Sequence, residues 1–331
     1  MDKKRNILIS IVFVMLIVLI PVGTLLKMVK QSIPLNQYTG ALVGRYQMIK
    51  FNTAITERLT GGNYMESNEV LLGKNGWLFY KVETDGTPLH DYMGLNHFSN
   101  EEMEMALNNM EEFGNKLADR GIKYAVMTIP NKEQVYSEYM PDTVPVISEV
   151  SRLDELTEYV KEKCGGVIGG KYPYIDMTDI LIEKAAEYPL YYVTDTHWTE
   201  EGSFLAMQEM MNELYGKRQN IDDVQFATYP GFVGDLTKIS GTMDRFTDVT
   251  YELLEESIGP DMYCGGTLFV VGDSFGDAML HVAEHYYDNV YWVRIKDYES
   301  GLIDKYNPDV VLWECVERYL PDMVEARVDI K

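Results

Sequence analysis

The fold of this chain is decided by the stretch Leu268-Phe269-Val270-Val271-Gly272-Asp273-Ser274-Phe275. An apolar, β-branched and aromatic run that breaks at a glycine and continues into a helical pattern predicts a strand, a turn and a helix. Such a turn places the start of the helix at the carboxyl edge of a sheet, where open α/β proteins bind ligands. Backbone N–H groups and the helix dipole beside Ser274 would suit a nucleophile that forms an oxyanion. The alternative is that Ser274 only caps the helix, because Asp and Ser are preferred caps.

A second candidate motif lies in the stretch Tyr191–Gly202, where Asp195 precedes His197 by two residues. This spacing lets the carboxylate accept the ring Nδ1–H of the same loop, which leaves Nε2 free to accept a proton. The alternative is a helix entry, in which Thr199 is the N-cap and Glu200 lies in the first turn. Both can hold, because that cap begins after the Asp–His pair. The two loops together favour a serine hydrolase or acyltransferase.

Strand-like and helix-like segments alternate along most of the chain. The predicted strands are Lys123–Ile129, Tyr172–Asp176, Thr267–Gly272, Asn289–Ile295 and Asp309–Glu314. The predicted helices occupy residues 99–119, 148–164, 177–187, 200–216, 275–287 and 299–306. This alternation predicts a three-layer α/β domain with helices on both faces of a mostly parallel sheet. Residues 219–262 indicate an irregular insertion over the cleft, and Asn75-Gly76 indicates a hairpin-type turn.

The loops at the carboxyl edge of this sheet supply further candidates. Asn131 and Lys132 follow the first of the parallel strands, and Glu314 ends the last. Asn131 would donate to an oxyanion, Lys132 would hold a sugar or a carboxylate, and Gly272 adjoins the nucleophile. The alternative is ordinary loop chemistry, since Asn favours turns. We predict substrate or oxyanion contacts for Asn131, Lys132 and Gly272. Glu314 is a candidate for such a contact only because it ends the last strand.

At these residues the chain resembles a known family. The segments Asp195-Thr196-His197-Trp198 and Gly272-Asp273-Ser274-Phe275 are similar to motifs of the SGNH-type polysaccharide O-acetyltransferases related to the alginate acetylation proteins, and most similar to the DHHW proteins of Gram-positive bacteria. Residues 73–79, 129–136 and 307–318 also fit, so the resemblance covers roughly residues 67–320. In that family the order along the chain is Asp, His and then Ser, whereas ordinary SGNH esterases have the Ser block first and a D-x-x-H block last. Thr196 stands where the name places the first His, so this position is not needed for proton transfer.

The resemblance implies an SGNH-hydrolase-like fold in which Ser274, His197 and Asp195 are the catalytic residues. Ser274 would attack an acyl donor, His197 would take the proton, and Asp195 would orient the imidazole. The acceptor implied is a cell-surface or secreted polysaccharide. The partner implied is a membrane-bound O-acyltransferase that delivers acetyl groups across the membrane. We expect neither a cofactor nor a metal ion for this triad.

The amino-terminal segment predicts a membrane anchor. Residues 7–26 are almost wholly apolar, and about 20 residues at ~1.5 Å rise span the hydrocarbon core of a bilayer. Basic residues at positions 3–5 favour a cytoplasmic amino terminus and an extracellular remainder. We therefore predict a cytoplasmic tip and single transmembrane helix at 1–30, a juxtamembrane stalk at 31–66 and a catalytic domain at 67–331. A cleaved signal peptide is the alternative, although its apolar core is usually shorter.

Composition excludes one class of partner. The chain has 29 basic and 52 acidic residues, for a net charge of −23, so the phosphates of a nucleic acid would be repelled. The three cysteines, Cys164, Cys264 and Cys315, match neither a zinc-ligand pattern nor a disulfide framework. Outside the cell one pair could oxidise, and the sequence does not say which.

Three rival functions stay open. A carbohydrate esterase would use the same triad with water as the acceptor. A glycan-binding or assembly subunit would keep the fold without the reaction. A zinc hydrolase would use His281 and His285 of the segment His-Val-Ala-Glu-His, which matches an inverted zinc-peptidase pattern. Glu314, Glu317 or Glu325 would then be the additional zinc ligand.

Overall fold

The computed structural model describes residues 67–82 and 84–326. The predicted anchor at 7–26 and stalk at 31–66 lie outside these residues. Residues 68–239 and 243–331 cluster into one compact unit, and the described part of this unit holds the elements discussed below. No helix within the described residues is long and apolar enough to cross a bilayer.

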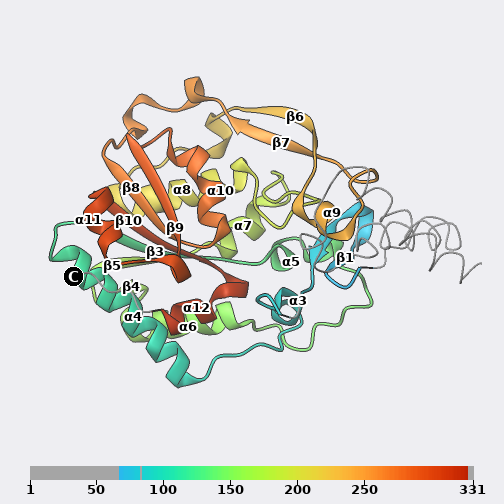
Figure 1. Ribbon diagram of the computed structural model, residues 1–331, viewed down its shortest axis with the longest axis horizontal. Coiled ribbons are helices and arrows are strands. Elements are labelled where there is room, and N and C mark those ends of the chain that lie inside the picture. Colours follow the sequence, from blue (N-terminus) through green and yellow to red (C-terminus); the bar gives the residue numbers. More distant parts are fainter. Residues whose placement is uncertain (1–66, 83, 327–331) are drawn as a thin grey trace, which may run out of the picture. The chain divides into compact units, whose positions relative to one another are not determined.

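A six-stranded sheet forms the centre of the described unit, in the order β4-β5-β3-β10-β8-β9 (Figure 1). All neighbouring pairs are parallel except β4 with β5. The strands are β3 (Lys123–Ile129), β4 (Val167–Ile168), β5 (Tyr172–Asp176), β8 (Thr267–Gly272), β9 (Asn289–Arg294) and β10 (Val310–Val316). Because β3, β5, β8, β9 and β10 run in the same direction, their carboxyl ends meet at one edge, as the sequence predicts.

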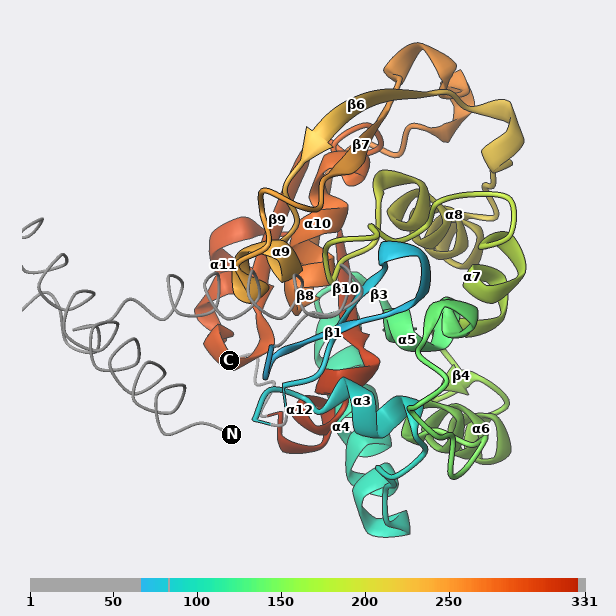
Figure 2. The same ribbon diagram turned by 90° about the vertical axis from the view of Figure 1, so that its right-hand side faces the viewer.

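Helices cover both faces of the sheet, which gives three layers (Figure 2). On one face lie α7 (Thr178–Lys184), α8 (Glu200–Tyr215) and α10 (Ser274–Ala283). On the other lie α4 (Asn100–Ala118), α6 (Arg152–Cys164), α11 (Gly301–Tyr306) and α12 (Pro321–Glu325). Every residue of β10 is buried, and its side chains alternate between the two cores. This burial explains why such a strand is a nearly continuous apolar run.

Smaller elements surround the carboxyl edge of the sheet. Two antiparallel pairs join β1 to β2 and β6 to β7. The bounds of the smaller elements are β1 (Val70–Leu72), β2 (Leu78–Tyr80), α3 (Pro88–Tyr92), α5 (Lys132–Val135), β6 (Phe226–Phe232), α9 (Asp235–Ser240) and β7 (Asp248–Leu253). The turn between β1 and β2 contains Asn75 and Gly76, whose φ angles are 54° and 85°, as expected from the predicted turn.

The predicted bounds of β3, β5 and β8 agree with the structure. Helix α6 begins at Arg152, later than predicted, because Ser151 caps it. The Ser151 hydroxyl accepts the Asp154 N–H, and the Asp154 carboxylate accepts the Ser151 N–H. This reciprocal pair fixes where the helix starts.

The prediction that residues 219–262 are irregular is wrong, because they contain the β6–β7 hairpin and α9. The sequence of β6 includes Pro230 and Gly231, and both residue types weaken a strand pattern. The residues of the two hairpin strands are half-buried or exposed, apart from the buried Leu253, so the hairpin also lacks the continuous apolar run of a buried strand.

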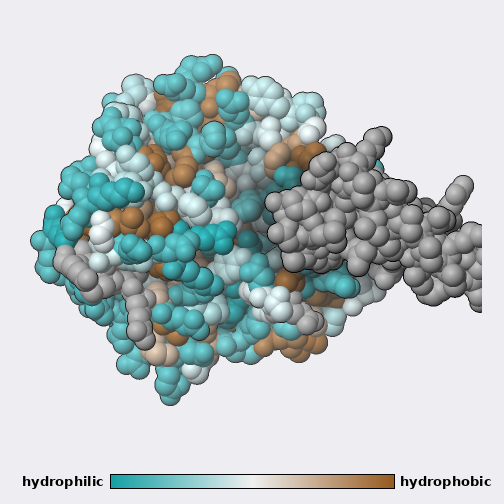
Figure 3. Space-filling model, in the orientation of Figure 1, coloured by the Kyte–Doolittle hydropathy of each residue, from teal (hydrophilic) through white to brown (hydrophobic). Residues whose placement is uncertain are grey.

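The face shown in Figure 3 is largely hydrophilic, with small and separate hydrophobic patches. Such a surface fits the excess of acidic residues in the composition. Cys164, Cys264 and Cys315 are all free thiols in the structure, and Cys315 is buried in β10 as a small apolar side chain.

Candidate active site

Ser274 is the first residue of α10 and stands two residues after Gly272, the last residue of β8. The helix cap is Asp273, whose Oδ1 accepts the Phe275 N–H at 2.8 Å. Its Oδ2 accepts the Val316 N–H of β10 at 2.7 Å, which holds the turn against the sheet. The structure therefore rejects the alternative in which Ser274 is the cap, and the Ser274 hydroxyl stays available for another partner.

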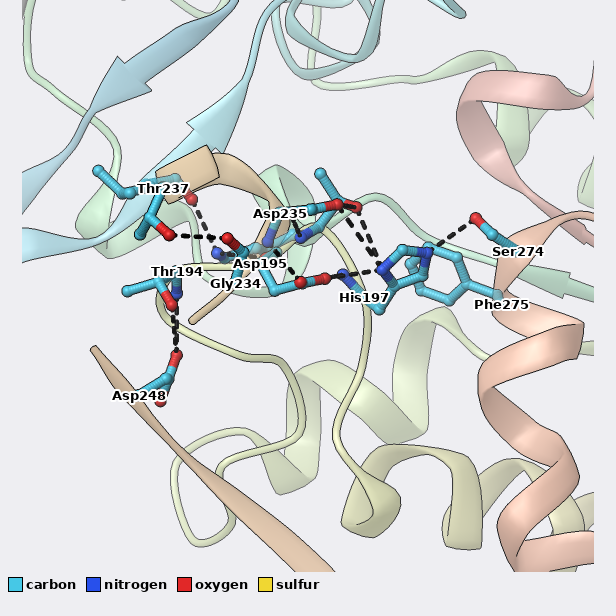
Figure 4. Close-up of polar contacts among 12 residues, drawn as sticks. Thr194, Asp195, His197, Gly234, Asp235, Thr237, Asp248, Ser274 and Phe275 are labelled. Atoms are coloured by element: carbon cyan, nitrogen blue, oxygen red, sulfur yellow. Dashed lines mark hydrogen bonds and ion pairs between the residues drawn. The ribbon is translucent and has the colours of Figure 1, made fainter. Parts of the chain in front are cut away.

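That partner is His197 (Figure 4). The distance from His197 Nε2 to Ser274 Oγ is 2.8 Å, and His197 Nδ1 lies 2.7 Å from Asp195 Oδ1. A carboxylate only accepts hydrogen bonds, so we assign the ring proton to Nδ1. Nε2 is then the acceptor of the serine proton. The sequence-predicted residues Ser274, His197 and Asp195 thus form one continuous hydrogen-bonded chain.

Asp195 is kept ionised by its surroundings. Burial is the largest single influence and raises the pKa of this carboxyl, but the hydrogen bond and charge of His197, together with backbone hydrogen bonds, hold the pKa below its usual value. Two backbone N–H groups, those of His197 and Asp235, also donate to the carboxylate, at 3.0 and 2.7 Å. Hydrogen bonds to the charged form stabilise it. An ionised Asp195 fixes the ring of His197 in the orientation that serves Ser274.

Asp235, at the start of α9, is a site residue that the sequence analysis missed. Its carboxylate accepts the Thr196 N–H at 2.8 Å and the Thr196 hydroxyl at 2.5 Å. Its Oδ2 lies 3.8 Å from His197 Nδ1. Burial and the neighbouring charge of Asp195 raise the pKa of Asp235. Two carboxylates therefore flank the same imidazole nitrogen, and both would stabilise an imidazolium.

The approach of Asp235 depends on the glycine before it. A Cβ atom at Gly234 would lie 2.1 Å from the Thr194 carbonyl oxygen, so a side chain there would push the two loops apart. The available sequence signal was the pair Gly234-Asp235 ahead of a short helical pattern. The prediction of an irregular segment at 219–262 does not include this short helix, so it does not identify Asp235.

We expect Asp235→Asn to lower kcat about 5- to 10-fold, because a charge near an imidazolium at a partly exposed site contributes about 1 kcal/mol. Asn can still accept a hydrogen bond from Thr196, so the melting temperature should change little. The matched control is Asp248→Asn, since Asp248 accepts the Thr194 N–H on the same loop but makes no contact with His197 among the described interactions. Equal kcat values for the two variants would show that Asp235 has no electrostatic role.

Lys132 lies at the edge of the sheet as predicted, but it points inward. Its side chain is 2% exposed. The ammonium donates to the carbonyls of Leu78, Val193 and Asp195, at 2.7, 3.0 and 3.0 Å. These bonds use all three of its donors. The predicted contact of Lys132 with a sugar or a carboxylate is therefore wrong, and its role is to attach the Asp195 loop to β2.

Asn131 is also committed within the protein. Its side chain is 0% exposed. The amide nitrogen donates to Asp91 Oδ2 at 2.9 Å, and the amide oxygen accepts the Arg318 N–H at 3.3 Å. A group without exposed surface does not reach an acyl donor, so the structure contradicts the oxyanion role predicted for the Asn131 side chain.

Gly272 serves the packing of the nucleophile turn. A Cβ atom there would lie 2.3 Å from Glu314 Oε2 and 2.5 Å from the Glu314 carbonyl oxygen. The residue must therefore be glycine for β8 and β10 to approach each other. This requirement explains the glycine without a direct substrate contact.

An oxyanion donor remains at the start of α10. The Phe275 N–H is taken by the Asp273 carboxylate, and the Asp273 N–H by Glu314 at 3.2 Å. Within the part of the chain that the structure describes, the Ser274 N–H has no such partner. It lies on the nucleophile itself and at the positive end of the helix, which is where an oxyanion is stabilised.

The structure does not support the alternative in which His281 and His285 bind zinc. Helix α10 ends at Ala283, so His281 and His285 do not share one uninterrupted helical face. Among residues 67–82 and 84–326, the only group of three metal-type ligands close enough to share an ion is Asp195, His197 and Asp235. The hydrogen bonds of the triad already account for these side chains.

Comparison with known proteins places the chain in a family. Residues 70–262, more than half of the chain, match the family described as the SGNH hydrolase-like domain of acetyltransferase AlgX. The chain belongs to this family. The matched segment includes Asp195, His197 and Asp235, and it ends before Ser274.

A curated relative and two solved structures are similar to this chain. The chain is 23% identical to the probable alginate O-acetylase AlgJ of Pseudomonas syringae pv. tomato in an alignment 290 residues long that covers 76% of this chain and 69% of the relative. Bacillus cereus PatB1 with a sulfonyl adduct is 13% identical, with a TM-score of 0.53, over 78% of this chain and 100% of that one. A DHHW family protein from Eubacterium siraeum is 14% identical, with a TM-score of 0.51, over 78% and 98%. The two structures share the fold of this chain.

Proposed function

We propose that this protein is an O-acetyltransferase that moves an acetyl group onto a hydroxyl of a cell-surface or secreted polysaccharide. The observation that carries the proposal is the position of His197, whose ring nitrogens lie 2.8 Å from Ser274 Oγ and 2.7 Å from Asp195 Oδ1. The family of the chain and the name of its alginate-acetylating relative support the acetyl group and the glycan acceptor.

The reaction would proceed through an acyl-enzyme. Ser274 Oγ attacks the carbonyl carbon of the donor while His197 Nε2 takes the hydroxyl proton, and the carbonyl electrons move onto oxygen. The Ser274 N–H stabilises this oxyanion. When the tetrahedral intermediate collapses, the bond between the acetyl carbon and the leaving group of the donor breaks. The leaving group takes the proton from His197. The acceptor hydroxyl then gives its proton to His197 and attacks the acetyl carbonyl, and the second collapse returns the proton to Ser274 Oγ.

The nearest rival is a carbohydrate esterase, which differs only in using water in the second half of the reaction. The non-catalytic rival is a glycan-binding or assembly subunit. Exposure of the globular part to an activated aryl acetate tests the proposal. Mass spectrometry should find acetyl on the peptide that contains Ser274, and a soluble oligosaccharide should gain acetyl as this adduct disappears. Loss of the adduct to acetate alone favours the esterase. Absence of any adduct with several donors favours the binding subunit.

We further propose that the protein is anchored in the cell membrane by residues 7–26, with its catalytic domain outside the cell. A membrane-bound O-acyltransferase would then supply the acetyl groups. The supporting observation is the length of the apolar run behind the basic residues at positions 3–5. Protease treatment of intact cells should release the globular part. The control is lysed cells, in which a cytoplasmic marker is cut as well. Protection of the globular part in intact cells would reverse the topology and remove the polysaccharide substrate.

A further inference from the structure

Glu314 lies in β10 directly beneath the nucleophile turn, and none of the interactions of the triad uses it. The residue is 0% exposed. Its Oε2 accepts the Asp273 N–H at 3.2 Å, and the Gly276 N–H donates to the same carboxyl group. These two backbone groups stand on either side of Ser274 in the chain. Glu314 thus holds both ends of the segment that carries the nucleophile.

Two glycines leave room for this carboxyl group. A Cβ atom at Gly272 would lie 2.3 Å from Glu314 Oε2, and one at Gly276 would lie 2.8 Å from the same oxygen. Neither position therefore tolerates a side chain while Glu314 is in place. Gly272 and Gly276 are each two residues from Ser274, so the glycine pair of this turn is explained by the carboxyl group that it encloses.

The surroundings of Glu314 favour its uncharged form. Burial, and then the charge of Asp273, raise the pKa of this carboxyl well above its usual value. On its own strand the neighbour is the Cys315 thiol, whose pKa burial also raises. The nearby cation, Arg318, interacts with Asp273. A side-chain hydrogen bond with Asp273 also raises the pKa of Glu314. Among the described residues, Glu314 Oε1 is buried without a hydrogen-bond partner, and a buried oxygen in that position costs a carboxylate more free energy than it costs a neutral acid.

We propose that Glu314 is a positioning residue, a neutral carboxylic acid that fixes the turn so that the Ser274 hydroxyl faces His197 and the Ser274 N–H faces the oxyanion. The effect of Glu314 on the reaction rests on the proposed function, whereas its protonation state is independent of that function.

We expect Glu314→Asp, which keeps the carboxyl group, to lower kcat more than Glu314→Gln, which removes it. Glu314→Gln keeps an oxygen that accepts both N–H groups and lacks a charge, so kcat should stay within about 3-fold of the wild type. Glu314→Asp is one methylene shorter and does not reach both N–H groups. Its kcat should fall about 10- to 100-fold with KM unchanged, because a displaced nucleophile affects the chemical step.

Infrared difference spectroscopy of the full chain at pH 6 reads the proton directly. The wild-type-minus-Glu314→Gln spectrum should contain the carbonyl band of a protonated carboxylic acid. The matched control is Glu201→Gln, because burial raises the pKa of Glu201 to about 7 and Glu201 has no hydrogen bond to the nucleophile turn among the described contacts. The control should lose its own acid band with kcat unchanged.

Two results would overturn the proposal: a difference spectrum that shows only an ionised carboxylate, or a kcat for Glu314→Asp equal to that of the wild type. If Glu314→Asp does not fold, Glu314→Gln must still keep its kcat within about 3-fold, and a larger loss contradicts a neutral positioning acid. If the wild type has no acetyl turnover, the proposed function fails while the infrared band still decides the state of Glu314.

Discussion

Ser274→Ala should lower acetyl turnover by about 10⁴- to 10⁶-fold, because loss of the nucleophile removes the covalent route. The stability should hardly change. The cap of α10 is Asp273, and the contact found for the Ser274 hydroxyl is with His197. Turnover of an activated aryl acetate and a thermal melting curve of each variant check both parts of the prediction.

The control for this variant is His281→Ala on the same helix. His281 is seven residues beyond Ser274, about 10 Å along the helix axis, so its loss should leave turnover nearly unchanged. A Ser274→Ala protein that keeps its turnover would contradict the acyl-enzyme mechanism. Metal-dependent turnover that disappears with His281 would instead support the zinc hydrolase.

Asp195→Asn should lower kcat by about 10⁴-fold, as expected when the partner of a catalytic histidine no longer fixes the tautomer. His197→Ala should lower kcat at least as much, because among the described residues His197 is the base that contacts Ser274 Oγ. The two effects should not add in the double variant, since both residues act on the same proton. Additive losses would mean that Asp195 acts independently of His197.

The difference in stability between the wild type and Asp195→Asn should depend on pH. The pKa of Asp195 is depressed in the folded protein, so its ionisation stabilises the fold above the unfolded pKa of about 4, and this contribution is lost as pH falls through the folded pKa. The stability gap between the wild type and Asp195→Asn should therefore narrow in acid. Denaturant titrations at neutral and acidic pH measure this gap, and a constant gap would show that the charge of Asp195 does not contribute.

Strands β3, β5 and β8 have the bounds that the sequence predicts. In β3 and β8 every residue except Lys123 is buried, so a nearly continuous apolar run marks each strand. Burial alone does not fix the ends, because every residue of β10 is buried and its predicted end, Glu314, lies two residues before the observed end at Val316. The convergence of Ser274 with the Asp195–His197 loop was predicted from the position of Ser274 at a strand end and from the spacing of Asp195 and His197, because that loop links α7 to α8 and does not follow a strand of the sheet. No energetics of the site were needed for that prediction.

The residues whose roles the sequence did not predict fall into two kinds. For some, the role depends on the direction in which the side chain points. For others, it depends on a contact with a residue far away in the sequence. A lysine after a strand gives no sign of whether its ammonium faces solvent or, as Lys132 does, backbone carbonyls. The role of Asp235 depends on its contact with Thr196, which is 39 residues away in sequence, and the pair Gly234-Asp235 by itself indicates only the start of a helix. The contact with Asp235 explains the threonine at position 196, because its hydroxyl and its N–H both donate to that carboxylate.

The three carbonyls bound by Lys132 set a lower limit on how far the globular part can be shortened. One of them belongs to Leu78 in β2, which pairs with β1 at Val70–Leu72. A fragment trimmed past this hairpin would keep Ser274, His197 and Asp195 and yet leave a buried ammonium with an unfilled hydrogen bond beside the Asp195 loop. The first dozen residues of the globular part are therefore as necessary to the site as the motifs that mark it, although no reacting group lies among them.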